Sequence, residues 1–162
     1  MKKITIFILS LVGLLTSLSC TMAQENEIEK YDLYVNNYHI QSDNTVIIRN
    51  SIMLFPFRTI FESLGATIKW NELSGDIDLE YNGNNYICYV KEPNPGYGKY
   101  FYVKDSKMNN HIYLTPMSMG GGFDIVNDYT YLYKETAEYL LRALDCSVTI
   151  DKINKIVNVS KN

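Results

Sequence analysis

Short segments in which hydrophobic and polar residues alternate dominate this chain, and they predict a protein rich in β-strands. Residues 31–40 alternate on both sides of Asn36-Asn37, which is typical of a tight hairpin because asparagine tolerates positive φ angles. Further strand candidates follow at residues 45–48, 52–55, 66–70, 76–81, 86–90, 100–103, 111–114, 129–133, 146–150 and 156–160. Most of this chain is therefore expected to form β-sheet.

The alternation also predicts which side chains are buried. In residues 66–70, the apolar side chains of Ala66, Ile68 and Trp70 alternate with polar ones. Successive side chains of a strand point to opposite faces of its sheet. We therefore expect a half-buried strand with these three residues on its inner face.

Two segments have the spacing of helices instead. The first follows Pro56, which suits the first turn of a helix, and ends at Gly65, which suits the position after its last turn. Its apolar stripe consists of Phe57, Ile60, Phe61 and Leu64. The second predicted helix covers residues 134–144.

The end of the helix and the two strands after it occur twice. Residues 61–71 correspond to residues 141–151, with Leu64 matching Leu144 at a spacing of 80 residues. Two copies of one unit favour a repeated binding or scaffold module over a single catalytic pocket. We expect an α+β fold made of two repeats, each a curled antiparallel sheet packed on one helix, forming one domain or two abutting ones.

The predicted boundaries follow from composition. Residues 28–91 form the first repeat, residues 92–128 a loop-rich connecting segment with short strands, and residues 129–162 the second, divergent repeat. The connecting segment begins with Glu-Pro-Asn-Pro-Gly-Tyr-Gly, whose prolines and glycines cannot continue a strand ladder.

The first repeat resembles a known family. Residues 54–71, LFPFRTIFESLGATIKWN, resemble the signature of the copper amine oxidase N-terminal-like domain, which reads roughly V-P-L-R-x-I-x-E-x-L-G-A-x-V-x-W-D. The resemblance implies a small α+β module of secreted and cell-surface bacterial proteins. It also implies that the copper and quinone chemistry of the oxidases belongs to other domains. In the second copy Thr136, Glu138, Asp145 and Ile150 replace Pro56, Arg58, Gly65 and Trp70.

The start of the chain predicts export. Lys2 and Lys3 precede an apolar run that is too short to span a bilayer, and residues 1–23 have the layout of a bacterial signal peptide. Thr21-Met22-Ala23 is a cleavage site that would release the protein. Cys20 sits in a loose lipobox, so a lipid anchor there is the alternative and the one predicted link to a membrane.

The net charge of the chain indicates which classes of partner are disfavoured. Removing residues 1–23 leaves 13 basic and 18 acidic residues, a net charge of −5. This charge disfavours nucleic acid and anionic lipid as partners.

Cys88 and Cys146 remain in the mature chain, either as a disulfide or as buried thiols. We favour the thiols because Cys146 occupies the place of Ala66 in the repeat.

The prediction of function is based on the tyrosines of the chain. The chain has 14, and six of them lie between residues 86 and 113. Tyrosine offers a flat apolar face and a polar tip, which suit sugar rings and protein partners. We predict a non-catalytic extracytoplasmic module that binds cell-wall polysaccharide through Tyr97, Tyr100 and Tyr102. The alternative function is an adaptor that binds a surface protein. A purely structural explanation is that the tyrosines cover a small sheet, because aromatic residues favour strands.

Two groups of side chains offer chemistry other than polysaccharide binding. Asp76, Asp78 and Glu80 share one face of a strand, where they either serve a carboxylate-based hydrolase or form a solvated surface. His39, His111, Met117 and Met119 are the side chains available to copper, but methionine more often fills core space. We therefore predict no catalytic residue, metal or cofactor, and interpret Arg58 as structural unless a pocket surrounds it.

Overall fold

The computed structural model describes residues 28–91, 100–105, 111–112 and 122–162. The predicted signal peptide with Cys20, the loop with Tyr97, and Met117 and Met119 lie outside these residues. The strands of the larger sheet are β1 (Glu29–Val35), β2 (Tyr38–His39), β3 (Val46–Arg49), β4 (Ile52–Pro56), β10 (Phe123–Val126), β11 (Tyr129–Tyr133), β12 (Cys146–Asp151) and β13 (Ile156–Lys161). The strands of the smaller sheet are β5 (Thr67–Asn71), β6 (Asp76–Tyr81), β7 (Asn84–Lys91), β8 (Tyr100–Asp105) and β9 (His111–Ile112). The helices are α2 (Phe57–Ser63) and α3 (Lys134–Ala143).

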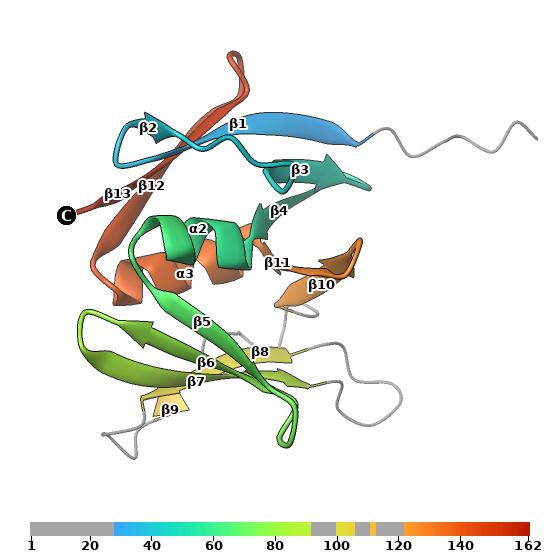
Figure 1. Ribbon diagram of the computed structural model, residues 1–162. Coiled ribbons are helices and arrows are strands. Elements are labelled where there is room, and N and C mark those ends of the chain that lie inside the picture. The colour runs from blue at the N-terminus through green and yellow to red at the C-terminus, as the bar shows by residue number, and fades with distance from the viewer. Residues whose placement is uncertain (1–27, 92–99, 106–110, 113–121) are drawn as a thin grey trace, which may run out of the picture.

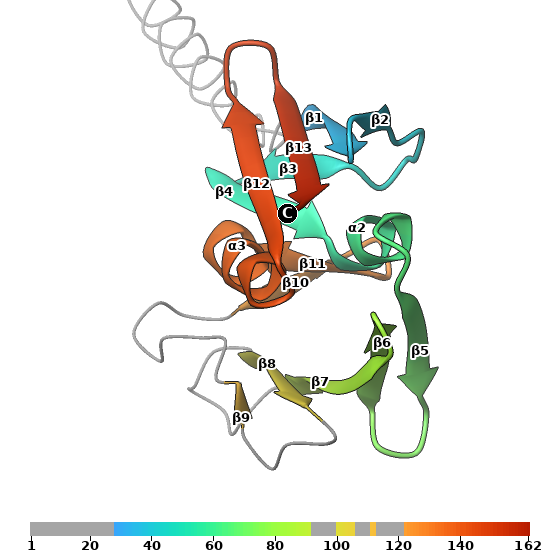
Figure 2. The same ribbon diagram turned by 90° about the vertical axis from the view of Figure 1, so that its left-hand side faces the viewer.

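Both helices lie between the two sheets, as Figure 1 and Figure 2 show. The larger sheet has the order β10-β11-β4-β3-β1-β13-β12, with β2 paired to β1, and the smaller has the order β5-β6-β7-β8-β9. The α+β class is therefore confirmed. Among the described residues, no helix is long and apolar enough to cross a bilayer.

One hydrophobic core joins the helices to both sheets. The predicted stripe of α2 is buried, with Phe57, Ile60 and Phe61 each 1% exposed. In α3, Leu140 and Leu141 are buried in the same cluster, together with residues of β1, β4, β6 and β13. Burying apolar area of this kind is the main source of folding free energy.

Two predictions from short sequence signals, the hairpin at Asn36-Asn37 and the end of the first helix at Gly65, are also confirmed. The hairpin around Asn36-Asn37 forms, with Val35 opposite Tyr38 and both asparagines at positive φ. Gly65 has a φ of +92° directly after the last turn of α2, a conformation that side chains with a Cβ rarely adopt.

Two segments of the fold share their order of elements and their strand register. We call β3–β4–α2–β5–β6 the first unit and β10–β11–α3–β12–β13 the second unit. In the first unit Ile68 lies opposite Leu79, and in the second Val148 lies opposite Val159, 80 residues later in each case. The turns agree too, because the side chains of Asn71 and Asp151 each accept hydrogen bonds from the backbone N–H groups two and three residues further on.

Before the helices the spacing differs from the constant value of 80 that the sequence predicted. α3 has 10 residues and α2 has 7, so corresponding residues upstream are 77 apart. The hairpin pair Arg49 and Ile52 thus corresponds to Val126 and Tyr129. As a consequence Arg58 corresponds to Glu135 and not to Glu138.

The two units meet through β4 and β11. Phe55 lies opposite Leu132, which is its equivalent 77 residues later, and the pairing is antiparallel. Because an antiparallel pair centred on equivalent residues is symmetric, an approximate two-fold axis passes between Phe55 and Leu132. Both side chains are at most 1% exposed.

The predicted division into separate curled sheets is corrected by this pairing. Strands of both units share the larger sheet, because β4 joins β11, while β5 and β6 belong to the smaller sheet. The larger sheet is not wholly antiparallel either, since β1 and β13 run parallel with Leu33 opposite Val157. The first and last strands of the fold are therefore neighbours.

Cys88 and Cys146, the two cysteines in the described residues, are free, and the alternative of a disulfide between them is wrong. Cys88 and Cys146 are both buried, and the Cys146 sulfur lies 3.6 Å from the Tyr81 hydroxyl. Burial raises the pKa of the Cys88 thiol, and burial together with the contact to Cys146 raises the pKa of Tyr81 to about 12. Both groups are thus held in their protonated form in the folded protein.

We expect the protein to lose stability in alkaline solution. In the unfolded chain a thiol ionises near pH 8.5 and a tyrosine near pH 10, so above about pH 9 the unfolded state binds fewer protons than the folded one. The free energy of unfolding should fall as pH rises, with Tyr81 accounting for a loss on the order of 2 kcal/mol between pH 10 and 12. Urea unfolding at several pH values measures this, and Tyr81→Phe should flatten the curve in that interval. An equally steep fall in the variant would contradict the assignment.

Candidate functional site

The predicted tyrosines are only partly placed by the structure. Tyr100 and Tyr102 belong to β8, where Tyr100 lies opposite Lys91 and Tyr102 opposite Tyr89. Tyr97 lies outside the described residues. The tyrosine surface therefore stays a prediction.

The three carboxylates do not form one open surface. Asp78 and Glu80 are exposed, but Asp76 is only 5% exposed and one of its oxygens has no hydrogen-bond partner in the described part of the chain. Asp76 lies opposite Asn71 on β5 and Tyr89 on β7, so these two side chains flank its carboxyl group. The expectation of three outward carboxylates is thus wrong for Asp76.

The copper alternative lacks a common site in the described residues. His39 belongs to β2 in the larger sheet, with its Nε2 atom 3.7 Å from the Asp32 carboxylate, whereas His111 belongs to β9 in the smaller sheet. Across the described ranges, no three His, Cys, Asp or Glu side chains gather in a way that would hold a metal ion.

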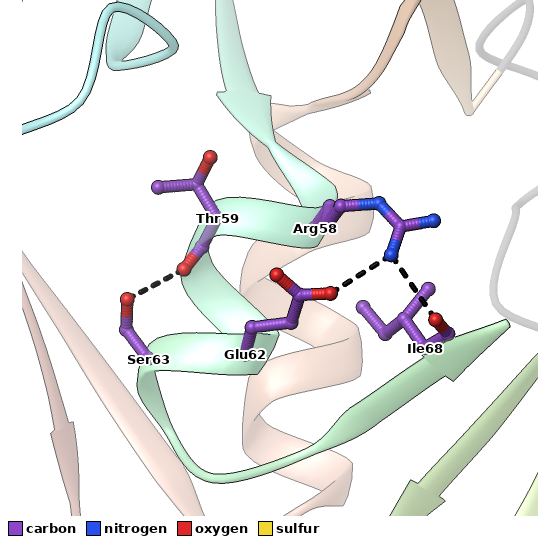
Figure 3. A network of polar contacts seen from close by, with 5 residues as sticks. All are labelled: Arg58, Thr59, Glu62, Ser63 and Ile68. Atoms are coloured by element: carbon purple, nitrogen blue, oxygen red, sulfur yellow. Dashed lines mark hydrogen bonds and ion pairs between the residues drawn. The ribbon is translucent and has the colours of Figure 1, made fainter.

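Arg58 joins the start of α2 to β5. Its Nη1 atom donates hydrogen bonds to the Glu62 carboxylate at 2.8 Å and to the Ile68 backbone oxygen at 3.0 Å (Figure 3). On the next face of the helix the Ser63 hydroxyl donates to the Thr59 carbonyl at 2.7 Å. These contacts agree with the structural role predicted for Arg58, but that prediction applied only if no pocket surrounded the residue, and Arg58 also lines a cleft.

This cleft, which we call the Trp70 cleft, lies where the first unit meets the turn between β10 and β11. Its volume is about 240 Å³. It is lined by Phe57, Arg58, Ile68, Trp70 and Ile77 of the first unit and by Asp128, Tyr129 and Thr130 of the second. Trp70 is 53% exposed and Tyr129 is 46% exposed. Two large aromatic side chains therefore border one hollow, with an arginine and an aspartate in its wall.

The exposure of Trp70 corrects the sequence prediction. Ala66 and Ile68 are buried as expected, but Trp70, on the same side of β5, is half exposed. β5 is the edge strand of its sheet, and the neighbour of Trp70 is the β10–β11 turn. Sequence reasoning missed this site because the turn comes from the other unit. The available signal was Ile150 at the equivalent position, which shows that the fold accepts an aliphatic residue there.

The chemistry of the Trp70 cleft favours binding over bond cleavage. Aromatic faces provide apolar contact area and the polar groups fix orientation, the usual composition of small-ligand sites. The Arg58 guanidinium offers N–H donors, and the Asp128 carboxylate offers acceptor oxygens.

Comparison with protein families shows which family the chain belongs to. The profile of the copper amine oxidase N-terminal domain matches residues 34–159, which include both units. The chain belongs to this family. In copper amine oxidases the copper amine oxidase N-terminal domain is a non-catalytic accessory domain. Comparisons with curated proteins and with solved structures give no significant match.

Proposed function

We propose that this copper amine oxidase N-terminal domain is a non-catalytic, extracytoplasmic module that binds cell-wall polysaccharide. The observation that carries the proposal is the pair of half-exposed aromatic residues, Trp70 and Tyr129, on the border of one cleft. The signal-like start of the chain supports export to the compartment where such a ligand is found.

The size and wall of the cleft suit a sugar residue. A volume of about 240 Å³ is below that of a typical drug-sized pocket and matches one ring of a longer chain that continues across the surface. Trp70 and Tyr129 would pack on the apolar faces of that ring. Asp128 would accept a hydrogen bond from a hydroxyl or N-acetyl group, since its carboxylate is exposed.

The tyrosines predicted from the sequence form a second proposed contact surface. Tyr100 and Tyr102 lie two residues apart on β8 of the smaller sheet, opposite Lys91 and Tyr89. In this proposal the polysaccharide chain held in the Trp70 cleft continues to this strand.

Co-sedimentation with isolated bacterial sacculi tests the proposal. The chain without residues 1–23 should bind saturably, and binding should persist after removal of teichoic acid. The triple variant Tyr97→Ala, Tyr100→Ala, Tyr102→Ala should bind more weakly if the second surface contributes. No sedimentation above that of a control protein would contradict wall binding and would direct the search to a protein partner. Release of reducing sugar that disappears in Asp78→Asn would instead favour the hydrolase alternative.

A further inference from the structure

The approximate two-fold axis creates a second cleft equivalent to the first. This cleft, which we call the Ile150 cleft, has a volume of about 510 Å³. The start of α3 and β12 form one side, and the turn between β3 and β4 forms the other. The residues that correspond to Arg58, Trp70, Asp128 and Tyr129 are Glu135, Ile150, Ser51 and Ile52, and all four line it.

Comparing the Trp70 cleft with the Ile150 cleft shows which side chains the fold requires at these positions. Both clefts follow from the same arrangement of helix, strand and turn, and the Ile150 cleft forms without an aromatic pair or an arginine at these positions. The pairing of units therefore does not explain why Trp70 and Tyr129 are large and half exposed. Side chains that the fold does not require, gathered around one hollow, indicate a ligand.

The guanidinium of Arg58 has unused donors. Its Nη1 atom makes both contacts, to Glu62 and to the Ile68 carbonyl, and Figure 3 shows the opposite edge of the group facing away from both. That edge carries the Nε and Nη2 donors, which make no hydrogen bond to another described residue. Two parallel N–H donors match the two oxygens of a carboxylate.

The contacts to Glu62 and Ile68 also fix the position of this edge. An arginine that is already held loses less side-chain entropy when it binds, so its free donors are prepared for a planar acceptor. The neighbouring charges limit what that acceptor is. Glu62 is paired with Arg58, and Asp128 adds a negative charge to the wall. Repulsion from these acids grows with the charge of the ligand, so it disfavours a densely charged phosphate polymer more than a sugar ring with a single carboxylate, which also gains the hydrogen bonds of Arg58.

We propose, resting on the proposed function, that the Trp70 cleft binds a sugar residue that carries a carboxylate. Arg58 holds the carboxylate, and Trp70 and Tyr129 pack on the ring. Asp128 accepts a hydrogen bond from a neutral donor on the same sugar. Muramic acid in glycan strands that have lost their stem peptides, whose removal frees the carboxylate, and uronic acid in a secondary polymer both have this chemistry.

Calorimetric titration with two forms of one ligand tests the inference. The first form is wall glycan strands freed of their peptides, and the second is the same strands with their carboxylates amidated. We expect the affinity for the amidated strands to be about tenfold lower, because a hydrogen bond to a charged group is lost. Arg58→Gln should lower the affinity for untreated strands by about the same factor and abolish the difference between the two ligands.

The controls separate ligand binding from folding. Arg58→Gln also removes the ties to α2 and β5, but a purely structural effect would weaken both ligands equally and keep their ratio. Arg58→Lys keeps the positive charge but lacks the two parallel N–H donors, so it should retain part of the difference in affinity between the two ligand forms. Arg142→Gln removes an exposed arginine elsewhere and should change neither affinity.

The possible outcomes are distinct. Equal affinity of the unsubstituted protein for both forms would overturn the carboxylate inference and leave wall binding standing. Absence of binding to either form, together with no sedimentation on sacculi, would overturn both. Oligomers of glucuronic acid identify the source of the carboxylate: binding that depends on Arg58 supports a uronic acid, and binding of the wall strands alone supports muramic acid.

Discussion

Replacing Phe55 with alanine should lower the free energy of unfolding by about 3–5 kcal/mol, the usual cost of emptying a phenylalanine site in a core. Phe55 is fully buried and lies opposite Leu132, at the axis between the two units. The cavity would therefore open at the junction of the units. Urea denaturation followed by circular dichroism measures the loss.

A surface variant provides the comparison for Phe55. Leu73 is fully exposed at the tip of the β5–β6 hairpin, so Leu73→Ala should change stability by no more than about 0.5 kcal/mol. The unsubstituted protein should unfold in one transition, because the core is continuous across the axis. Two separate transitions, or a loss below about 1 kcal/mol for Phe55→Ala, would contradict a shared core.

Replacing Trp70 with alanine should weaken binding to sacculi by about 30-fold, the effect of losing roughly 2 kcal/mol at a central aromatic contact. Trp70 is half exposed, so the truncation removes ligand contact area and leaves little cavity in the core. The thermal unfolding temperature should therefore change much less than the affinity. Co-sedimentation at a series of protein concentrations gives both dissociation constants.

The second cleft supplies the matched control for Trp70. Ile150 occupies the equivalent position, so Ile150→Ala removes a side chain from the same place in the other unit. We expect this variant to bind sacculi like the unsubstituted protein. Equal losses in both variants would show that the clefts contribute alike, and no loss in Trp70→Ala would remove the Trp70 cleft from the binding surface.

The elements of this fold are predictable because their signals are local. The Asn36-Asn37 turn, the apolar stripe of α2 and the glycine at position 65 each depend on a few neighbouring residues. The strand pairs after each helix were likewise visible as a repeated pattern. These features require no knowledge of how distant segments meet.

The assembly of the elements was not predictable in the same way. The pairing of β4 with β11 and of β1 with β13 joins segments far apart in the chain, and neither leaves a trace in the local alternation. The different helix lengths shifted the correspondence from 80 to 77 residues, which misaligned Arg58 with Glu138. Sheet membership therefore needed the structure.

The candidate site was missed for the same reason. Trp70 looks like a core residue in its own strand, and Tyr129 looks like an ordinary strand residue. The cleft appears only when the turn at Asp128 is placed against β5. Arg58 was singled out by its motif, and its structural role was foreseen from its position at the start of a helix.

The central claim is that a wall polysaccharide lies against Trp70, and fluorescence tests it most directly. Trp70 is the one tryptophan in the chain, so the indole emission reports on this cleft without further labelling. Adding soluble wall glycan should shift the emission to shorter wavelength as the half-exposed ring leaves water, with a midpoint that agrees with sedimentation. Sedimentation on sacculi with an unchanged tryptophan spectrum under saturating soluble glycan would contradict the claim and place the ligand elsewhere.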